Sequence, residues 1–326
     1  MSRHLVRSLV FLALLALPAA ASAAPQGSAK APKPSQGPQQ ATVKIVRIGH
    51  LRGGKAQVYS TVPVIGLVSP FVPGQRVEVS FYLDGRRVQH QKVKVSKGKR
   101  NSGSFRARVR VEEAGKYAVA ARLAPTATLG GDSTIRKSWK VSFPALHQGQ
   151  CGDVVVGFKK AMRKLGYIVN SGRCFGDKTG RGVLAYRKVN GMARSSRAGA
   201  GLVKRVFAGR GEYEVRHPGA GEHLEAPLSK QVLVFAKGDK VFAVYPVSSG
   251  KSSTPTVTGS FTFIRTEPGY NSHGMYYSFY FYGGYAVHGY ELVPDYPASH
   301  GCIRTFIADQ PEIYNRIHYG EPIFVF

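Results

Sequence analysis

The chain has 326 residues, about twice the length of a usual domain, so two or three domains fit it better than one core. Hydrophobic residues make up 43% of it, which excludes a wholly disordered chain, and its 38 glycines and 19 prolines exclude a coiled coil and favour a β-rich architecture. With 46 Lys and Arg against 18 Asp and Glu, the net charge of +28 predicts an anionic partner: nucleic acid, anionic lipid or an acidic cell wall.

Residues 1–23 have the pattern of a secretory signal peptide. Arg3 and Arg7 precede an apolar run from Leu9 to Ala21, and Ala21-Ser22-Ala23 supplies small residues for cleavage. The apolar run is shorter than the ~20 residues that span a bilayer, so we predict no transmembrane segment, with an uncleaved anchor as the alternative. Export argues against nucleic acid as a partner and predicts a secreted protein of the cell wall or periplasm.

Residues 24–40 are rich in Pro, Gln and Ser and contain almost no large apolar residue, which predicts a disordered linker. Apolar residues then alternate with polar ones over residues 41–146, as half-buried strands require, and Asp84-Gly85 between two such runs indicates a hairpin. About seven short strands predict an immunoglobulin-like β-sandwich. The alternating strand that carries Arg106, Arg108 and Arg110 is interpreted either as a solvated face or as a contact for wall polyanions.

Over residues 147–211 the apolar period becomes helical and predicts three helices. In the first helix Lys159 falls on the polar face, Asp153 can cap the start and Gly166 the end. Cys151 and Cys174 flank this helix, whereas Cys302 stands alone far along the chain. In an exported protein thiols are paired or reserved for chemistry, so we expect a Cys151–Cys174 disulfide and a free Cys302.

The same segment resembles peptidoglycan-binding-like domains. The resemblance depends on Leu165-Gly166-Tyr167, Asp177, Thr179, Val183, Tyr186 and Gly191-Met192. It differs from the family where Tyr186-Arg187 replaces the usual Phe-Gln. The resemblance implies a small three-helix module that binds the wall, and the alternative is a structural spacer held by the disulfide.

Residues 221–326 return to β patterning and contain the most informative stretch of the sequence, Ser299-His300-Gly301-Cys302-Ile303-Arg304. A nucleophilic thiol needs a nearby imidazole to take its proton and donors to stabilise the oxyanion that follows. His288 precedes Cys302 by 14 positions, so one strand can present the base and the next loop can return the thiol beside it. Gly301 allows close approach of the backbone, whose N–H groups at residues 301 and 302 are candidate oxyanion donors.

These residues resemble the L,D-transpeptidase catalytic domain of the YkuD family, whose signature is a His followed by Ser/Thr-His-Gly-Cys-x-Asn/Arg. A weaker likeness is the run from Thr256 to Phe261, which is similar to the family's Thr-Pro-x-Gly-x-Phe segment with Val257 in place of Pro. The ten residues between His288 and Ser299 are fewer than usual in the family, which implies a short loop over the site.

The resemblance implies a role for each matching residue. Cys302 matches the nucleophile, His288 the general base and Gly289 the carbonyl that orients the base. Arg304 matches a polar position where a guanidinium can bind a substrate carboxylate. The residues that match the loop-shaping and oxyanion motif are Ser299, His300 and Gly301.

We therefore expect a mainly β, multidomain, exported enzyme that uses no cofactor and no metal, with peptidoglycan stem peptides and the anionic wall as partners and wall biogenesis and cell shape as its context. Two alternatives for the site are His300 as the base and zinc bound by His288, His300 and Cys302. Two alternatives for the function are an L,D-carboxypeptidase or endopeptidase with the same thioester, and a catalytically inactive wall-binding protein.

Overall fold

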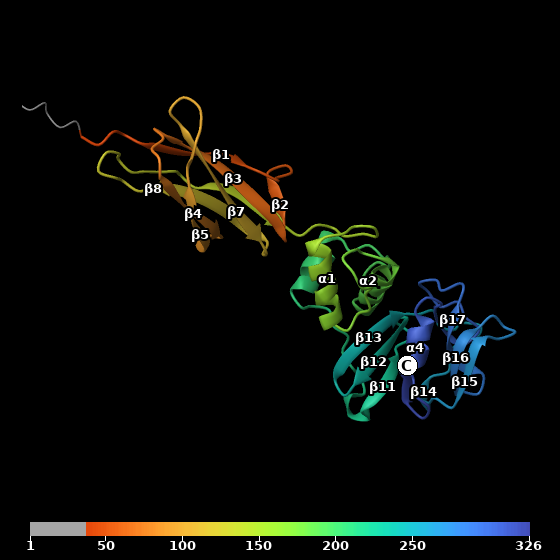
Figure 1. The fold of residues 1–326 in the computed structure, drawn as a ribbon. Coiled ribbons are helices and arrows are strands. Elements are labelled where there is room, and N and C mark those ends of the chain that lie inside the picture. The colour runs from red at the N-terminus through yellow and green to blue at the C-terminus, as the bar shows by residue number, and fades with distance from the viewer. Residues whose placement is uncertain (1–36) are drawn as a thin grey trace, which may run out of the picture.

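The computed structural model describes residues 37–326, which form a row of three parts: a β-sandwich, a helical module and a C-terminal β domain (Figure 1). The predicted signal peptide (1–23) and residues 24–36 of the predicted linker lie outside the described residues. The end of that linker differs from the prediction, because the Gln39 N–H donates to the Thr128 carbonyl and the Gly130 N–H to the Gln39 carbonyl, both at 2.9 Å. Within residues 37–326, every helix is too short or too polar to cross a membrane.

Two β-sheets form the sandwich, and most of their strands are antiparallel. The first sheet has the order β1-β3-β7-β6, and the second has the order β2-β10-β8-β4-β5 with β9 beside β8. The strands are β1 (Thr42–Ile48), β2 (Lys55–Gln57), β3 (Ser60–Ser69), β4 (Arg76–Leu83), β5 (Arg86–Lys94), β6 (Ser96–Lys97), β7 (Gly103–Val111), β8 (Gly115–Leu123), β9 (Asp132–Ser133) and β10 (Lys137–Ser142).

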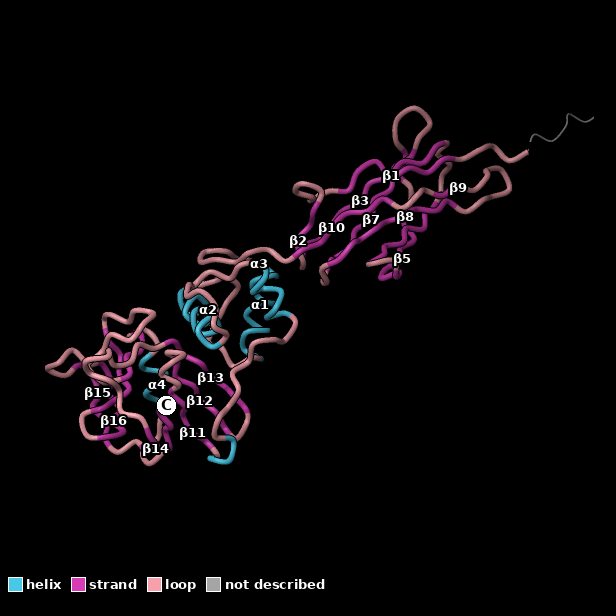
Figure 2. The backbone as a smooth tube through the Cα atoms, turned by 180° about the vertical axis from the view of Figure 1, so that it is seen from behind, coloured by secondary structure: helices cyan, strands magenta, loops and turns pink. Residues whose placement is uncertain are grey.

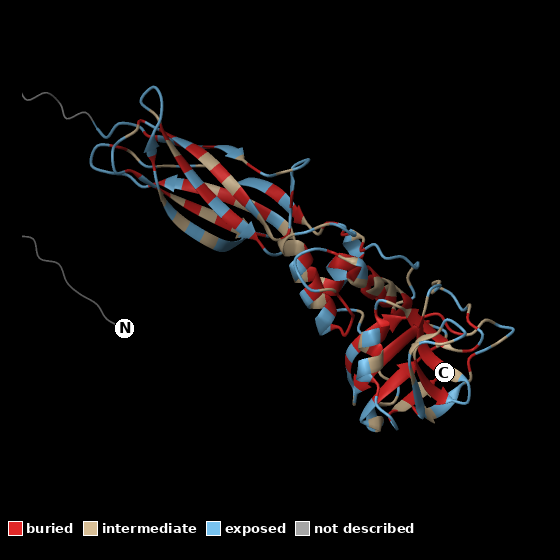
Figure 3. Ribbon diagram, turned by 45° about the vertical axis from the view of Figure 1, so that its right-hand side comes forward, coloured by how far each residue is buried: buried red, intermediate tan, exposed pale blue. Residues whose placement is uncertain are grey.

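The alternation predicted from the sequence places one side of each central strand in the sandwich core, as the burial colours show (Figure 3). On β7 the buried Phe105, Ala107 and Val109 alternate with the exposed arginines. Asp84 and Gly85 join β4 to β5 with φ of 48° and 88°, so both central residues of the hairpin turn are left-handed, as its tight two-residue form requires.

The helical module contains α1 (Asp153–Lys164), α2 (Asp177–Val189) and α3 (Ala200–Phe207). Gly166 ends α1 as predicted: it has φ +79° and its N–H donates to the Arg163 carbonyl, while the next N–H, of Tyr167, donates to the Met162 carbonyl. Asp153 does not cap the helix. Its carboxylate instead pairs with Arg110 of the sandwich and with Arg173.

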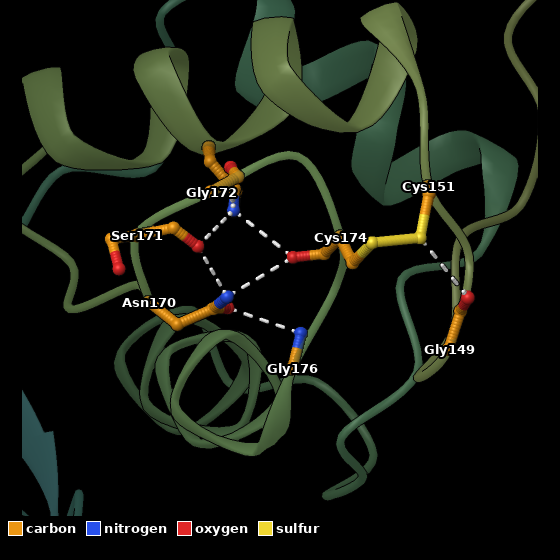
Figure 4. Close-up of a disulfide and its surroundings, with 8 residues drawn as sticks. Gly149, Cys151, Asn170, Ser171, Gly172, Cys174 and Gly176 are labelled. Carbon is orange, nitrogen blue, oxygen red and sulfur yellow. Dashed lines mark hydrogen bonds between the residues drawn. A yellow bond between two sulfur atoms is a disulfide. The ribbon is translucent and has the colours of Figure 1, made fainter.

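A disulfide joins Cys151 to Cys174 beside α1 (Figure 4). The prediction that Lys159 faces solvent is wrong, because its side chain is 1% exposed. Its Nζ donates to the carbonyls of Ser171 (3.1 Å), Gly172 (2.6 Å) and Cys174 (3.0 Å). Burial lowers the pKa of this ammonium group. The ammonium group thus holds the loop that leads into the disulfide.

The C-terminal domain has two further sheets, seen from the other side in Figure 2, with orders β13-β12-β11-β19-β14 and β15-β16-β17-β18. Its helices are the 3₁₀ turn η1 (Pro218–Ala220) and α4 (Gln310–Arg316). The strands are β11 (Glu222–Ala226), β12 (Val232–Lys237), β13 (Lys240–Pro246), β14 (Gly259–Thr262), β15 (Arg265–Tyr270), β16 (Tyr276–Tyr282), β17 (Tyr285–Tyr290), β18 (Ile303–Phe306) and β19 (Pro322–Val325).

The helical module and the C-terminal domain share one hydrophobic core. Side chains of α1, α2 and α3 pack with those of β12 and β13 in a single cluster. Arg181 on α2 makes two hydrogen bonds to the Asp309 carboxylate, at 2.5 and 2.7 Å, in a largely buried ion pair. Lys178 pairs with Glu312 on α4. The module therefore packs as part of the C-terminal domain, whereas the sequence suggests a separate unit.

Candidate active site

The candidate catalytic residues lie on two parallel neighbouring strands, β17 and β18. His288 is paired in register with Arg304, and Cys302 immediately precedes β18. Side chains two residues apart along a strand share one face of the sheet, and paired residues share that face too. His288 and Arg304 thus share one face of the sheet, and Cys302 lies at the start of β18, two positions before Arg304.

His288 is a buried imidazole with a defined orientation. Its Nδ1 lies 2.9 Å from the carbonyl oxygen of Gly289, and since a carbonyl only accepts, Nδ1 carries the hydrogen and Nε2 is free to accept one. Burial lowers the His288 pKa to about 4, helped by the positive charge of Arg304 and opposed by the Gly289 hydrogen bond. The imidazole is therefore neutral at physiological pH.

Cys302 is the one free cysteine among residues 37–326, and it is partly exposed. Its thiol contacts the Gly284 carbonyl at 3.5 Å. Burial raises the pKa of the thiol, while the Ala286 N–H and the Arg304 charge act in the opposite direction. The thiol and the imidazole are thus both neutral at rest, so the thiol must lose its proton before the sulfur can attack.

Ser299 shapes the loop that carries Cys302. Its hydroxyl donates to the Cys302 carbonyl at 2.5 Å and accepts from the Gly301 N–H at 3.1 Å. The Gly301 N–H, one of the two expected oxyanion donors, thus already has a partner in the Ser299 hydroxyl. No hydrogen bond from the Cys302 amide is found within residues 37–326. The Cys302 N–H therefore remains a candidate oxyanion donor.

Two structural features require a glycine at position 301. Its φ is +119°, a region that favours glycine, and a Cβ there would lie 2.7 Å from Cε1 of Tyr285. The Tyr285 ring thus leaves no room for a side chain at position 301.

Arg304 is buried yet has no carboxylate partner among the described residues. Its guanidinium stacks 4.0 Å from the centroid of Tyr290, and one amino group lies 3.4 Å from the Ala298 carbonyl. A buried guanidinium without an acidic neighbour leaves donors for a carboxylate from outside the chain.

His300 does not join the other predicted site residues. Its side chain is exposed, and its Nε2 lies 3.4 Å from Lys251 Nζ. Within the described part of the chain, no three His, Cys, Asp or Glu side chains form a group that could hold a metal ion.

The structure adds two residues that no sequence motif indicated. Buried Gln231 binds buried Ser249, whose carbonyl accepts from the N–H groups of Ala298 and Ser299, both at 2.9 Å. Thr256 belongs to the run with the weaker likeness to the YkuD family. It is buried, and its hydroxyl accepts from the Gly250 N–H at 2.8 Å.

Comparison with known proteins matches residues 222–325 to the L,D-transpeptidase catalytic domain family. A crystal structure of an L,D-transpeptidase from Xylanimonas cellulosilytica is 26% identical over 56% of this chain and 98% of its own, with a TM-score of 0.52. The catalytic domain of the Enterococcus faecium L,D-transpeptidase is 27% identical over 33% of this chain and 98% of its own, with a TM-score of 0.29. No curated protein matches the sequence.

Residues 222–325 are therefore an L,D-transpeptidase catalytic domain, of the YkuD family that the Ser-His-Gly-Cys run indicates. These matches do not confirm the resemblance of residues 147–211 to a peptidoglycan-binding domain. The solved relative covers a larger share of this chain than the catalytic domain alone makes up.

Proposed function

We propose that this protein is an exported L,D-transpeptidase that cross-links or modifies peptidoglycan through a thioester on Cys302. The observation that carries the proposal is the position of Cys302 at the start of β18, beside the strand β17 that carries a neutral His288, whose Nδ1 is fixed by the Gly289 carbonyl. This arrangement leaves Nε2 as the proton acceptor for the thiol.

In the first half-reaction His288 Nε2 takes the proton of Cys302, and the sulfur attacks the carbonyl carbon of the last peptide bond of a stem tetrapeptide. The Cys302 N–H stabilises the oxyanion. The carbon–nitrogen bond then breaks, and the terminal D-Ala leaves with the proton returned by the imidazolium. The acyl group remains on sulfur as a thioester.

In the second half-reaction an amine of another stem peptide attacks the thioester. His288 accepts the proton of that amine, the carbon–sulfur bond breaks, and the proton returns to Cys302 sulfur. The unpaired Arg304 binds a carboxylate of the peptide substrate in this scheme.

The other parts of the chain keep the enzyme at the wall. The signal peptide directs export, and the arginines of β7 contact anionic wall polymers. The helical module contributes to wall binding in line with its sequence resemblance.

The test incubates mature protein with purified tetrapeptide muropeptides and follows products by mass spectrometry. Three variants accompany it: Cys302→Ala, His288→Ala and His300→Ala. Dimers that depend on Cys302 and His288 but not on His300 support transpeptidation with His288 as base. Release of D-Ala without dimers indicates the carboxypeptidase, and no turnover in the unmodified protein indicates an inactive wall-binding protein.

A further inference from the structure

A buried lysine of the helical module makes hydrogen bonds to the C-terminal domain, next to the residues that support the loop carrying Cys302. Lys188, on the last turn of α2, is 5% exposed, and its Nζ donates to the carbonyls of Gln231 (3.2 Å) and Val247 (2.8 Å). No carboxylate lies within ion-pair distance of it among residues 37–326. Both of its partners are therefore backbone groups of the neighbouring domain.

Gln231 links Lys188 to Ser249, because its carbonyl accepts from Lys188 and its side chain bonds Ser249. Its amide nitrogen donates to the Ser249 hydroxyl at 2.5 Å and to the Leu228 carbonyl at 2.6 Å, and its amide oxygen accepts from the Ser249 N–H at 2.9 Å. Gln231 also has φ +57°, a left-handed conformation that is costly for a residue with a Cβ. Such strain persists only where surrounding contacts hold it.

Ser248 and Ser249, which follow β13, make hydrogen bonds on both sides of the loop that carries Cys302. Ser248 exchanges backbone hydrogen bonds with Arg304, at 3.0 and 2.9 Å, and its hydroxyl donates to the Tyr296 carbonyl at 2.7 Å. The Ser249 carbonyl accepts a hydrogen bond from the Ser299 N–H. The Ser299 hydroxyl in turn accepts from the Gly301 N–H and donates to the Cys302 carbonyl. A continuous hydrogen-bonded path thus runs from α2 to the nucleophile.

A second contact from the helical module reaches the loop over the site. Arg194, which follows α2, donates to the carbonyl of Asp295 in the loop between β17 and β18. Burial and the nearby Arg194 charge lower the pKa of Lys188 to about 7, while the Asp295 charge acts in the opposite direction. Burying the charged end of a lysine costs desolvation free energy. Hydrogen bonds from its Nζ offset that cost only where carbonyl groups surround it.

We propose that Lys188 is a positioning residue for the transpeptidase reaction: through Gln231 and Ser249 it sets the conformation of the 299–302 loop, which makes the helical module an integral part of the active site. This inference rests on the proposed role of Cys302 as nucleophile. It assigns the helical module a function beyond wall binding.

The test compares full-length variants by the rate at which a carbapenem acylates Cys302, read from intact mass, and by the pH profile of Cys302 alkylation with iodoacetamide. Lys188→Met removes the ammonium group and keeps the volume of the side chain. Lys178→Met is the matched control, because Lys178 also links α2 to the C-terminal domain, through Glu312, but contacts no part of the path.

We expect Lys188→Met to slow acylation ~10-fold or more and to shift the alkylation profile, with Lys178→Met within ~2-fold of the unmodified protein. Lys188→Arg keeps a cationic donor and restores part of the rate. Ser249→Ala removes one hydroxyl of the path without touching α2, so it gives a smaller loss and covers the case in which Lys188→Met fails to fold. Combining Lys188→Met with Gln231→Met adds little to either loss, because both act on one path.

The proposal is overturned if Lys188→Met and Ser249→Ala behave like Lys178→Met, or if the Lys188 and Gln231 losses multiply. If carbapenem fails to acylate the unmodified protein, the proposed function fails instead. The alkylation profile then still decides the role of Lys188, since it reports the loop conformation without any substrate.

Discussion

His288 on β17 and Arg304 on β18 are paired in register, so an imidazole and a guanidinium share one face of the sheet beside Cys302. The Arg304 charge adds to burial in lowering the His288 pKa, and it also favours the Cys302 thiolate. The Arg304 charge thus adds to burial in keeping the base neutral, and it favours the anion that forms when the base acts.

The first prediction concerns stability against pH. The folded His288 pKa of about 4 lies below its ordinary value of 6.5, so the unfolded chain binds the proton first as the pH falls. The stability contributed by this residue is complete above about pH 6.5 and is lost as the pH falls toward 4. The loss is on the order of 3 kcal/mol.

His288→Asn retains an amide donor for the Gly289 carbonyl but does not titrate. Urea unfolding of the C-terminal domain at pH 7.5 and 4.5 measures the difference between this variant and the unmodified protein. The unmodified protein should lose more stability on acidification than the variant does. Equal losses in both would show that His288 is not buried as a neutral group.

The second prediction concerns Gly301→Ala. The added methyl group would lie 2.7 Å from the Tyr285 ring at a φ of +119°, so the loop must move and acylation of Cys302 should fall ~10-fold or more. Gly320→Ala is the control, because Gly320 also has a positive φ, +80°, but has open space around its Cβ position. Equal rates for the two variants would contradict the argument.

The third prediction concerns Arg304→Lys. Lysine keeps the charge near His288 but loses the planar pair of donors and the stacking on Tyr290. We expect the half-saturating concentration of the donor peptide to rise ~10-fold, since a bidentate carboxylate contact is lost. Steady-state kinetics with the acid and the C-terminally amidated donor check this. A variant that discriminates between the two donors as well as the unmodified protein does would rule out carboxylate binding by Arg304.

The fourth prediction concerns retention on isolated wall. Contact between exposed arginines and wall anions is screened by salt, so retention should fall steeply between low and physiological ionic strength. A variant with Arg106→Gln and Arg108→Gln should be retained less, and one with lysine at both positions should match the unmodified protein. Retention that does not change with salt would count against an electrostatic contribution.

Much of the architecture could be predicted from the sequence, because it depends on local patterns. The period of two in Phe105, Ala107 and Val109 determines which side of β7 is buried, and Gly166 ends α1 where its left-handed φ is needed. The candidate site could be predicted because Ser299 and the residues after it form one short motif that also shapes the loop.

The contacts between the helical module and the C-terminal domain could not be predicted in the same way. Lys188, which makes one of these contacts, is buried, and so is Lys159 within the helical module, although the sequence places Lys159 on the polar face of its helix. Each is stabilised by backbone carbonyls that only tertiary folding brings to its Nζ. The carbonyl partners of a lysine leave no pattern in the sequence, and neither does the left-handed Gln231.

The most direct test of the central claim is the intact mass of the protein after brief incubation with a tetrapeptide donor muropeptide. The account predicts an adduct equal to the donor less D-Ala, located on Cys302, absent from Cys302→Ala and formed much more slowly in His288→Asn. No adduct in the unmodified protein, or an adduct that persists in Cys302→Ala, would contradict the assignment of Cys302 as the nucleophile.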